Sequence, residues 1–293
     1  MEFRNIEKKD FELFQQYNSE NIRSTYNFIT NYIWAGDNYL KICEKDDCLI
    51  ILWDLGEKLY MQYPQGNSDK KKDIIRECCE YLKSRNNKAV FHSLNEEEIL
   101  ELKSYYPNDF LFEYDRNSSD YLYESEKLIN LSGKKLHSKK NHVNSFKRKN
   151  DFIYRRMTYN DIDKCKELFM VWYNTKDTTD TFIIRSKDAT FKLLEEYQNF
   201  GLIGGVIEVD GKIVACSIGE RIREDTALIH IEFADINYQG SYAIMNQQFI
   251  ENEWKDVKYI NREEDMGEEG LRKAKESYQP LRLLNLYTAR EKY

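Results

Sequence analysis

Lys275 is the residue whose position in this sequence most directly indicates chemistry. At about 100° per residue along the helix predicted for residues 268–277, Lys275 shares one narrow sector with Leu271, Ala274 and Tyr278. That sector should pack, so the ammonium must be paired, must extend along its stem to water, or must face a polar cleft. An ammonium in a cleft can stabilise the negative charge that develops on oxygen during acyl transfer.

Three carboxylates lie on the loop just before this helix, at Glu263, Glu264 and Asp265. They are candidate partners for the ammonium of Lys275. A carboxylate in this place can also orient or deprotonate an attacking group. We therefore nominate Glu264 as a catalytic residue beside Lys275.

The other charges of the helix have an ordinary explanation. Glu268 and Glu269 fall in the first turn, where negative charge interacts favourably with the helix dipole. Each also stands four residues before a base, Arg272 or Lys273, a spacing that contributes about a few tenths of a kcal/mol. These two ion pairs are therefore expected to stabilise the helix at its surface, and they do not indicate a functional role.

A strand predicted at 227–236 carries two further carboxylates. Because side chains alternate between the faces of a strand, Asp235 should share a face with three apolar residues, and Glu232 should share the other face with His230. The three apolar residues are Ile229, Ile231 and Phe233. Asp235 is a catalytic candidate, although a strand-end aspartate can also face water or cap the next helix.

Residues 127–150 contain no acid, in a chain whose net charge is −7. A helix through this segment would carry Lys139 and Val143 on one face, with Lys140 and Lys147 at its edge. The segment is either a solvated linker or a site for the phosphates of RNA, a coenzyme or a lipid headgroup.

Several functional classes are not expected. The sequence contains no GxSxG, GxxxxGK[ST], GxGxxG or HExxH motif, and its four histidines make a metal cluster improbable. The six cysteines form no CxxC pair, which predicts buried, reduced thiols. No apolar run approaches the roughly 18 residues of a membrane span, and the polar start is unlike a signal peptide. We expect a soluble cytoplasmic protein.

The elements that must position these residues occur in the same order twice. Each half reads as a helix, an antiparallel meander, a helix, a strand, a helix and a strand, and the repeat concerns the order of elements and not the residues. This predicts an α/β (α+β) fold with two mixed, mostly antiparallel sheets flanked by helices. The predicted domains are 1–125 and 151–293, joined by a basic linker helix at 126–150.

The repeated order resembles the tandem GNAT acyltransferase fold. The segment "GLRKAKESYQPLRLLNLY" is similar to the closing motif of the catalytic domain of phosphatidylglycerol lysyltransferases. Fem-type aminoacyltransferases end similarly, in a pattern that would place their lysine at Lys275 and their second aromatic at Tyr278. With "GKKLHSKKNHVNSFKR", "EFADINYQGSYAIMNQQF" and "INREEDMGEEGLRKAKESY", the chain resembles an uncharacterised soluble family grouped with the lysyltransferase C-terminal domain.

The resemblance implies an acyl or aminoacyl transferase with aminoacyl-tRNA as the donor. The acceptor would be an amine or hydroxyl of a small molecule, a peptide or a lipid headgroup. Lys275 would stabilise the oxyanion or the leaving 3′-hydroxyl, and Asp235 or Glu264 would orient or deprotonate the acceptor. The candidate substrate-binding residues lie in the same motifs and are Glu232, Asn246, Arg262, Glu263, Asp265, Arg272, Tyr278, Lys139, Lys140 and Lys147.

Two alternatives remain open. Ordinary GNAT enzymes bind the coenzyme A pyrophosphate on an R/Q-x-x-G-x-G/A loop, whereas "NYQGSYA" keeps Gln239 and Gly240 at a different spacing. The difference favours a non-catalytic GNAT pair that senses an amino acid, a nucleotide or RNA; a coenzyme-A-dependent N-acetyltransferase is the other alternative. An open cleft lined by Lys275 and a carboxylate would favour an enzyme, and aromatic side chains filling that space would favour a binding module.

Overall fold

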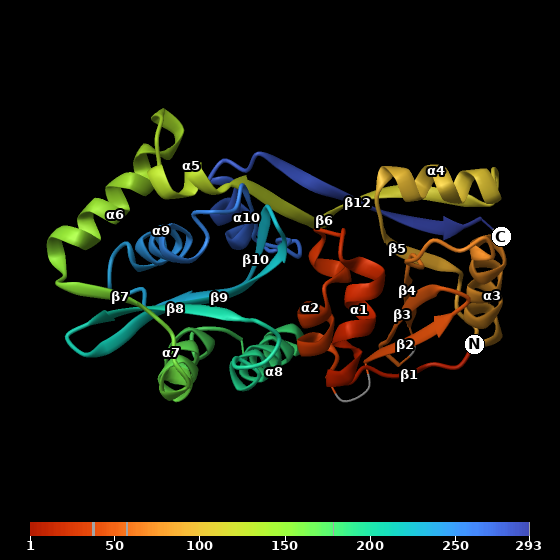
Figure 1. The fold of residues 1–293 in the computed structure, drawn as a ribbon, viewed down its shortest axis with the longest axis horizontal. Coiled ribbons are helices and arrows are strands. Elements are labelled where there is room, and N and C mark those ends of the chain that lie inside the picture. Colours follow the sequence, from red (N-terminus) through yellow and green to blue (C-terminus); the bar gives the residue numbers. More distant parts are fainter. Residues whose placement is uncertain (37–38, 57, 178, 293) are drawn as a thin grey trace. The chain divides into compact units, whose positions relative to one another are not determined.

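The chain forms two compact units in a computed structural model (Figure 1). Unit 1 comprises Met1–Asp120 and Leu284–Tyr293, and unit 2 comprises Tyr121–Leu283. Each unit contains a mixed sheet with helices packed on it. The structure describes residues 1–36, 39–56, 58–177 and 179–292.

The sheet of unit 1 begins as an antiparallel meander and ends with strands from distant parts of the chain. Strands β2, β3 and β4 are antiparallel, β5 is parallel to β4, and β12 is antiparallel to β5. The elements of this unit are β1 (Arg4–Asn5), η1 (Lys8–Asp10), α1 (Phe11–Asn18), η2 (Ser24–Tyr26), α2 (Phe28–Trp34), β2 (Leu40–Lys45), β3 (Cys48–Asp54), β4 (Leu59–Gln62), α3 (Lys71–Ser84), β5 (Val90–Leu94), α4 (Glu96–Tyr105), most of β6 (Phe110–Glu124) and most of β12 (Arg282–Glu291).

Helix α3 shows why unit 1 packs as it does. Ile75, Cys78 and Leu82 are spaced three and four residues apart, so they form one apolar stripe, and each is fully buried. The stripe joins Ile50 of β3 and Met61 of β4 in one core cluster. All six cysteines lie in the described part of the chain, and all are buried and unpaired, as predicted.

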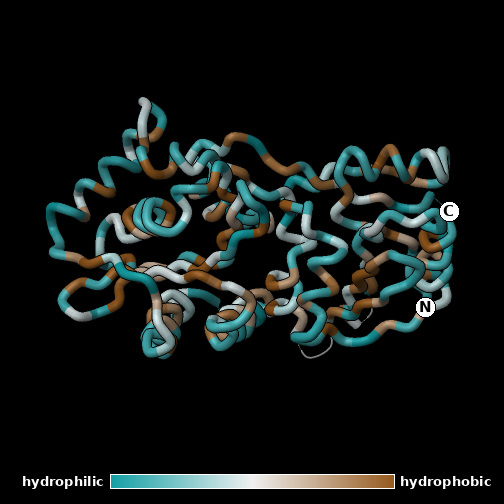
Figure 2. Tube along the Cα trace, in the orientation of Figure 1, coloured by the Kyte–Doolittle hydropathy of each residue, from teal (hydrophilic) through white to brown (hydrophobic). Residues whose placement is uncertain are grey.

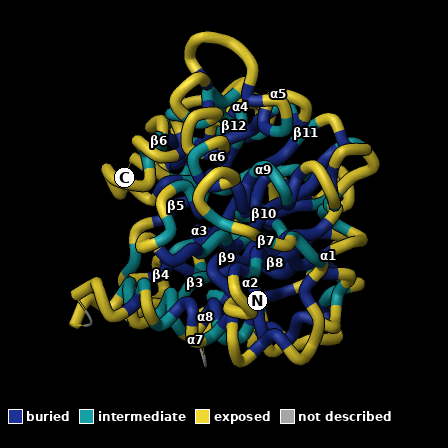
Figure 3. Tube along the Cα trace, turned by 90° about the vertical axis from the view of Figure 1, so that its left-hand side faces the viewer, coloured by how far each residue is buried: buried dark blue, intermediate teal, exposed yellow. Residues whose placement is uncertain are grey.

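The sheet of unit 2 has helices on both faces. In Figure 1, α7 lies on one face of β9 and β10, and α9 lies on the other. These strands are largely buried (Figure 3), and hydrophobic stretches run along the tube in this part of Figure 2. The elements are α5 (Ser125–Asn130), η3 (Lys134–Leu136), α6 (His137–Lys149), β7 (Phe152–Arg156), η4 (Tyr159–Asp161), α7 (Ile162–Tyr173), α8 (Thr181–Glu195), β8 (Ile203–Val209), β9 (Lys212–Arg223), β10 (Thr226–Ala234), α9 (Ser241–Glu253), β11 (Tyr259–Asn261) and α10 (Glu269–Glu276).

The basic segment is a packed part of unit 2. Val143 and Phe146 of α6 are buried in the same core cluster as Phe249 of α9. The rest of α6 is mostly hydrophilic (Figure 2), and Lys140 and Lys147 are exposed. The predicted amphipathic helix therefore forms, and its apolar side anchors it to α9.

The last strand of each half completes the sheet of the other unit. The second half ends in β12, which pairs with β5 of unit 1. The first half ends in β6, whose residues 122–124 pair with β11 of unit 2. Residues 284–293 therefore group with unit 1, whereas the sequence-based boundary placed them in the second domain. Pairing satisfies the backbone groups along β5 and β11, which would be costly to bury unpaired.

The repeat extends to residues, so the expectation that only the element order repeats is wrong. Arg4 makes a two-pronged ion pair with Asp10 at 2.8 and 2.6 Å, and Arg155 does the same with Asp161 at 2.7 Å for both bonds. In both places the arginine stands six residues before the aspartate. The backbone N–H three residues before each aspartate donates to the same carboxylate, which starts the first helical turn of each half.

Candidate functional site

Most of the polar residues nominated from the sequence gather where two parallel strands of unit 2 part. Pairing of β10 with β11 ends at Leu228 and Asn261, although β10 continues to Ala234. After Asn261 the chain enters a loop, residues 262–268, that leads into α10. The end of a parallel strand next to such a loop is a common place for ligand-binding side chains.

A β-bulge in β10 decides which side chains face this place. The register with β9 shifts between Ile229 and Ile231. Ile229 belongs to the core cluster that includes α9, whereas Phe233 packs on α7, on the opposite face of the sheet. The prediction that Ile229, Ile231 and Phe233 share a face is therefore wrong, because a bulge inserts one extra residue and inverts the alternation. The same shift turns Glu232 toward α9.

Glu232 is the centre of a buried polar cluster. Its Oε1 accepts a hydrogen bond from Arg262 Nη2 at 3.2 Å, and its Oε2 accepts one from Asn246 Nδ2 at 3.0 Å. The side chains of Glu232 and Arg262 are each 11% exposed, and Asn246 is 1% exposed. Two atoms of the cluster are buried without a partner among the described residues, Nη1 of Arg262 and Oδ1 of Asn246. One is a donor and the other an acceptor.

Two cations meet one aromatic ring in the same cluster. The Lys139 ammonium lies 4.2 Å from the centroid of the Tyr278 ring, and the Arg262 guanidinium lies 4.8 Å from it. Burial and the nearby charge of Arg262 lower the pKa of Lys139, while Glu232 opposes that shift. We call Lys139, Glu232, Asn246, Arg262 and Tyr278 the Glu232 cluster. All five were nominated from the sequence.

Lys275 is buried, and its ammonium binds main-chain carbonyls of the loop that carries the three candidate carboxylates. It donates to the carbonyl oxygens of Arg262 at 2.7 Å and Glu263 at 3.2 Å, and also to that of Glu264. Of the four residues in the predicted packing sector, Lys275 of α10 and Tyr278 just after it are buried, whereas Leu271 and Ala274 are exposed. The prediction that this sector packs is therefore wrong for its two apolar residues, because the buried side of α10 faces the polar loop.

The buried carboxylate of Asp265 connects the 262–268 loop to α10 and to Tyr121. Its carboxylate accepts from Tyr121 at 2.6 Å, from Arg272 at 2.8 Å on each oxygen, and from the N–H of Gly267 at 2.9 Å. Arg272, predicted to pair with Glu268, makes its two-pronged ion pair here. The other predicted pair, Glu269 with Lys273, forms at 2.6 Å. Asp265 and Arg272 thus shape the loop.

His230 is a site residue that sequence reasoning did not nominate. Its Nδ1 lies 3.0 Å from Glu263 Oε1, and its Nε2 lies 3.0 Å from Glu220 Oε1. Burial lowers the pKa of His230, but the hydrogen bonds to the two carboxylates outweigh burial and raise the pKa to about 9. No spacing in the sequence connects these three residues, because they come from three separate elements.

Asp235 belongs to a different set of contacts. It accepts from Lys212 at 3.1 Å and from the N–H and side-chain amide of Asn237 at 3.0 and 2.8 Å. Burial raises the pKa of Asp235, but these donors lower it overall. The contacts tie Asp235 to the turn before α9. Glu264, in contrast, lies half-buried on the loop bound by Lys275.

The start of α9 packs closely on α6. Gly240 has φ +92°, and a Cβ atom added to it would lie 2.4 Å from the carbonyl oxygen of His142. Gln239 accepts a hydrogen bond from Lys149 at 2.7 Å. Gln239 and Gly240, the two residues kept from the pyrophosphate-loop pattern, thus both contact α6. Of the three nominated lysines of α6, Lys139 joins the Glu232 cluster, whereas Lys140 and Lys147 are exposed.

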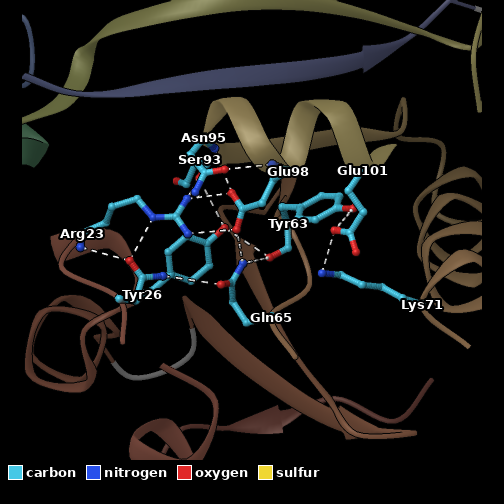
Figure 4. A network of polar contacts seen from close by, with 10 residues as sticks. Arg23, Tyr26, Tyr63, Gln65, Lys71, Ser93, Asn95, Glu98 and Glu101 are labelled. Atoms are coloured by element: carbon cyan, nitrogen blue, oxygen red, sulfur yellow. Dashed lines mark hydrogen bonds and ion pairs between the residues drawn. The ribbon is translucent and has the colours of Figure 1, made fainter. Parts of the chain in front are cut away.

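Unit 1 holds a polar network of another kind (Figure 4). Glu98 accepts from Arg23 at 2.7 and 2.9 Å, from Gln65 at 2.9 Å and from the N–H of Asn95 at 2.8 Å. Arg23 also donates to the carbonyl of Ser93 at 2.7 Å. Both oxygens of Glu98 have donors, and Asn95 and Glu98 form the capping box of α4. The network therefore anchors the start of α4.

Two classes of feature are missing from the described residues. No helix in the described ranges combines the length and the apolar character that crossing a bilayer requires. Within the same ranges, no three His, Cys, Asp or Glu side chains are arranged to hold a metal ion.

Comparison with known proteins relates most of the chain to one family. The family model described as phosphatidylglycerol lysyltransferase, C-terminal, matches residues 12–290. A crystal structure of a conserved protein of unknown function from Bacteroides thetaiotaomicron VPI-5482 is 31% identical with a TM-score of 0.90, and the match covers 99% of each chain. The structure of L-PGS from Bacillus licheniformis is 16% identical with a TM-score of 0.66, over 98% of this chain and 92% of that one.

A curated relative is similar over part of its length. The uncharacterized protein MYCGA3080 of Mycoplasmoides gallisepticum is 26% identical over 197 residues, which are 65% of this chain and 61% of that protein. The match therefore spans less than two thirds of the relative. The chain has the expected fold class, a mixed α/β tandem GNAT fold with mostly antiparallel strands and flanking helices.

Proposed function

The chain belongs to the phosphatidylglycerol lysyltransferase C-terminal family, and from this premise we propose that it is an aminoacyltransferase. It would move an aminoacyl group from aminoacyl-tRNA to an amine or hydroxyl acceptor. The proposal places the protein in the cytoplasm, where charged tRNA is found. One observation carries it: around one carboxylate, the Glu232 cluster holds a donor and an acceptor that have no partner in the described part of the chain.

These two atoms suit the two ends of an aminoacyl group. The guanidinium Nη1 of Arg262 can donate to the ester carbonyl, and Asn246 Oδ1 can accept from the α-ammonium. Glu232 adds a negative charge for the ammonium, and Lys139 adds a second positive charge near the carbonyl. A site whose buried polar atoms are completed only by such a ligand should discriminate strongly against ligands that lack one end.

The reaction requires few groups. An acceptor amine or hydroxyl attacks the ester carbonyl carbon, the new bond forms, and the bond to the 3′-oxygen of the tRNA breaks. The acceptor loses one proton, and the leaving 3′-oxygen gains one. Arg262 and Lys139 would stabilise the oxyanion, and Glu264 would take the acceptor proton. Lys275 would act by holding the loop that carries Arg262, and Asp235 by ordering the turn before α9.

Charge and packing around α6 support a tRNA donor. Lys140 and Lys147 are exposed on the helix that brings Lys139 to the cluster, so they can bind phosphates of a donor whose aminoacyl end lies at Tyr278. The close contact of α6 with Gly240 favours this donor over an acyl-CoA, because the α6 backbone lies against the loop where a coenzyme pyrophosphate would bind.

A second candidate function is supported by the aromatic surroundings of the two buried cations. The Lys275 ammonium lies 5.7 Å from the Tyr121 ring centroid, and the Arg262 guanidinium lies 5.6 and 4.8 Å from the ring centroids of Tyr123 and Tyr278. Aromatic side chains that fill such a space suit a non-catalytic module that senses an aminoacyl or amino-acid ligand. The same residues would bind the ligand in an aminoacyltransferase and in a sensing module, and only the aminoacyltransferase would turn the ligand over.

The test is transfer by the full chain from a radiolabelled aminoacyl-tRNA pool to amines, hydroxyl compounds, peptides and phosphatidylglycerol vesicles. We expect a labelled product, and a rate lowered about 10²-fold or more in Arg262→Lys and Glu232→Gln, the scale of losing one oriented charge. Lys164→Gln, an exposed lysine of α7, is the control. Tight binding of the donor without turnover would identify the sensing module. Thiol release from acetyl-CoA would identify an acetyltransferase, and no binding of any donor would overturn both proposals.

A further inference from the structure

We propose that His230 is a positioning residue: with Glu220 and Glu263 it forms a brace that holds Arg262 in place for the ligand. The role of Arg262 rests on the proposed function, but the brace itself does not. His230 touches neither end of the aminoacyl group in that proposal. It acts through the backbone next to Arg262.

Between two ionised carboxylates, the geometry of the brace requires a doubly protonated imidazole. Each ring nitrogen of His230 lies 3.0 Å from a carboxylate oxygen, and an ionised carboxylate can only accept. Both nitrogens must therefore carry a proton. The His230 side chain is 0% exposed, and those of Glu220 and Glu263 are 5% and 17% exposed, so little water can replace either bond.

The β10 bulge aims His230 at the loop. Ile229 pairs with Gly219 and Ile231 pairs with Ile218, so His230 is the extra residue of the bulge. Bulges commonly redirect a side chain in this way. Here the imidazole is directed at Glu263, the residue that follows Arg262 in the chain.

Glu263 needs to be held because its backbone is strained. Its φ of 56° lies in the left-handed region, which costs about 1 kcal/mol or more for a residue other than glycine. The side chain of Asn261 accepts from the N–H of Glu263 at 2.7 Å. The backbone N–H of Tyr121 and the ammonium of Lys275 donate to the carbonyl of Glu263 at 3.1 and 3.2 Å. His230 adds the contact to its side chain. Together these contacts keep the strained residue in one conformation. They thereby fix the orientation of the neighbouring Arg262 side chain.

The first experiment tests the brace without any ligand. In the full chain, ¹⁵N NMR of the imidazole should show that both nitrogens of His230 are protonated at pH 7. Hydrogen exchange at residues 262–264 should accelerate at least tenfold in His230→Gln, a change that corresponds to about 1.4 kcal/mol. The control, His142→Gln, changes an exposed histidine and should leave exchange unaltered. A neutral His230, or wild-type exchange of this loop in His230→Gln, would overturn the proposal.

The second experiment tests whether the brace acts through Arg262. The probe is a 3′-aminoacylamido-3′-deoxyadenosine, a stable mimic of the donor end, with its affinity measured by calorimetry. We expect His230→Gln and Arg262→Lys each to weaken binding about tenfold, and the double variant to bind less than about threefold more weakly than either, because coupled residues are not additive. Independent, multiplying effects would refute positioning. If the unmodified chain does not bind this probe, the proposed function fails, and the exchange experiment alone decides on the brace.

Discussion

The ammonium of Lys275 donates to three consecutive carbonyls, so its removal should act first on the loop that carries Arg262. Lys275→Met keeps the length of the stem and removes the charge. We expect unfolding by urea to show a loss of about 2 to 3 kcal/mol, since hydrogen bonds to a buried charge are among the strongest. Lys273→Met, on the exposed side of the same helix, should change stability by less than about 0.5 kcal/mol.

The opposite result has a clear meaning. If Lys275→Met unfolds like the wild type but transfers about 10²-fold more slowly, the ammonium acts on the reacting oxygen, as the sequence motif implied. Stability and rate measured on the same preparations therefore separate the two roles.

The pKa of His230 predicts how stability depends on pH. The pKa is about 9 in the folded chain and 6.5 in an unfolded one, so the folded state holds its proton more tightly. The stabilisation is fully present below pH 6.5 and is lost as the pH rises through about 9. Urea unfolding between pH 6 and 10 should show a steeper loss for the wild type than for His230→Gln. Parallel curves for the two proteins would contradict the assignment of a charged imidazole beside Glu220 and Glu263.

At the scale of elements, we expect the lysines of α6 to have two different roles. Lys140 and Lys147 are exposed, so replacing both with Gln should weaken tRNA binding and reduce the slope of its salt dependence by about two. Lys139→Gln should instead impair recognition of the aminoacyl end, because this ammonium lies on Tyr278. Binding titrations at several salt concentrations distinguish the effects, with Lys164→Gln as a control of equal charge change. An unchanged slope in the double variant would mean that α6 is merely solvated.

Strand β12 makes a separate prediction, because its last residues group with unit 1. Leu286 is fully buried there, and its N–H donates to Ser119 at 3.1 Å. Leu286→Ala should cost about 2 to 5 kcal/mol and should expose β5 to hydrogen exchange. Leu281→Ala, where the side chain is 43% exposed, should cost little. If Leu286→Ala lost protection from hydrogen exchange only in unit 2, the result would contradict the placement of β12 in the sheet of unit 1.

At the scale of the whole molecule, the duplicated Arg–Asp pair predicts that each half depends on its own copy. Asp10→Asn and Asp161→Asn should each cost about 1 to 3 kcal/mol, because each buried carboxylate accepts from an arginine and from a backbone N–H. Hydrogen exchange should show the loss mainly in residues 1–20 for the first variant and in 151–170 for the second. An identical pattern of lost protection in both variants would argue against independent copies.

Local patterns in the sequence determined a large part of this fold. The period of apolar residues predicted the order of elements in both halves and the burial of Val143, because periodicity depends only on neighbours along the chain. The motifs around Glu232, Asn246 and Arg262 named residues that the structure brings together. The role of these residues in binding or catalysis stays a prediction.

Only the tertiary structure decided the partners of the site residues. His230 and its two carboxylates are separated by 10 and 33 positions, and the bulge that brings them together interrupts the alternation on which strand patterns depend. Lys275 binds carbonyl groups, which every residue carries and which no sequence pattern can mark. The last strands of the two halves, β6 and β12, likewise each pair with a strand of the other unit. Hydrogen bonds between segments far apart in the chain decide which sheet edge each of them joins.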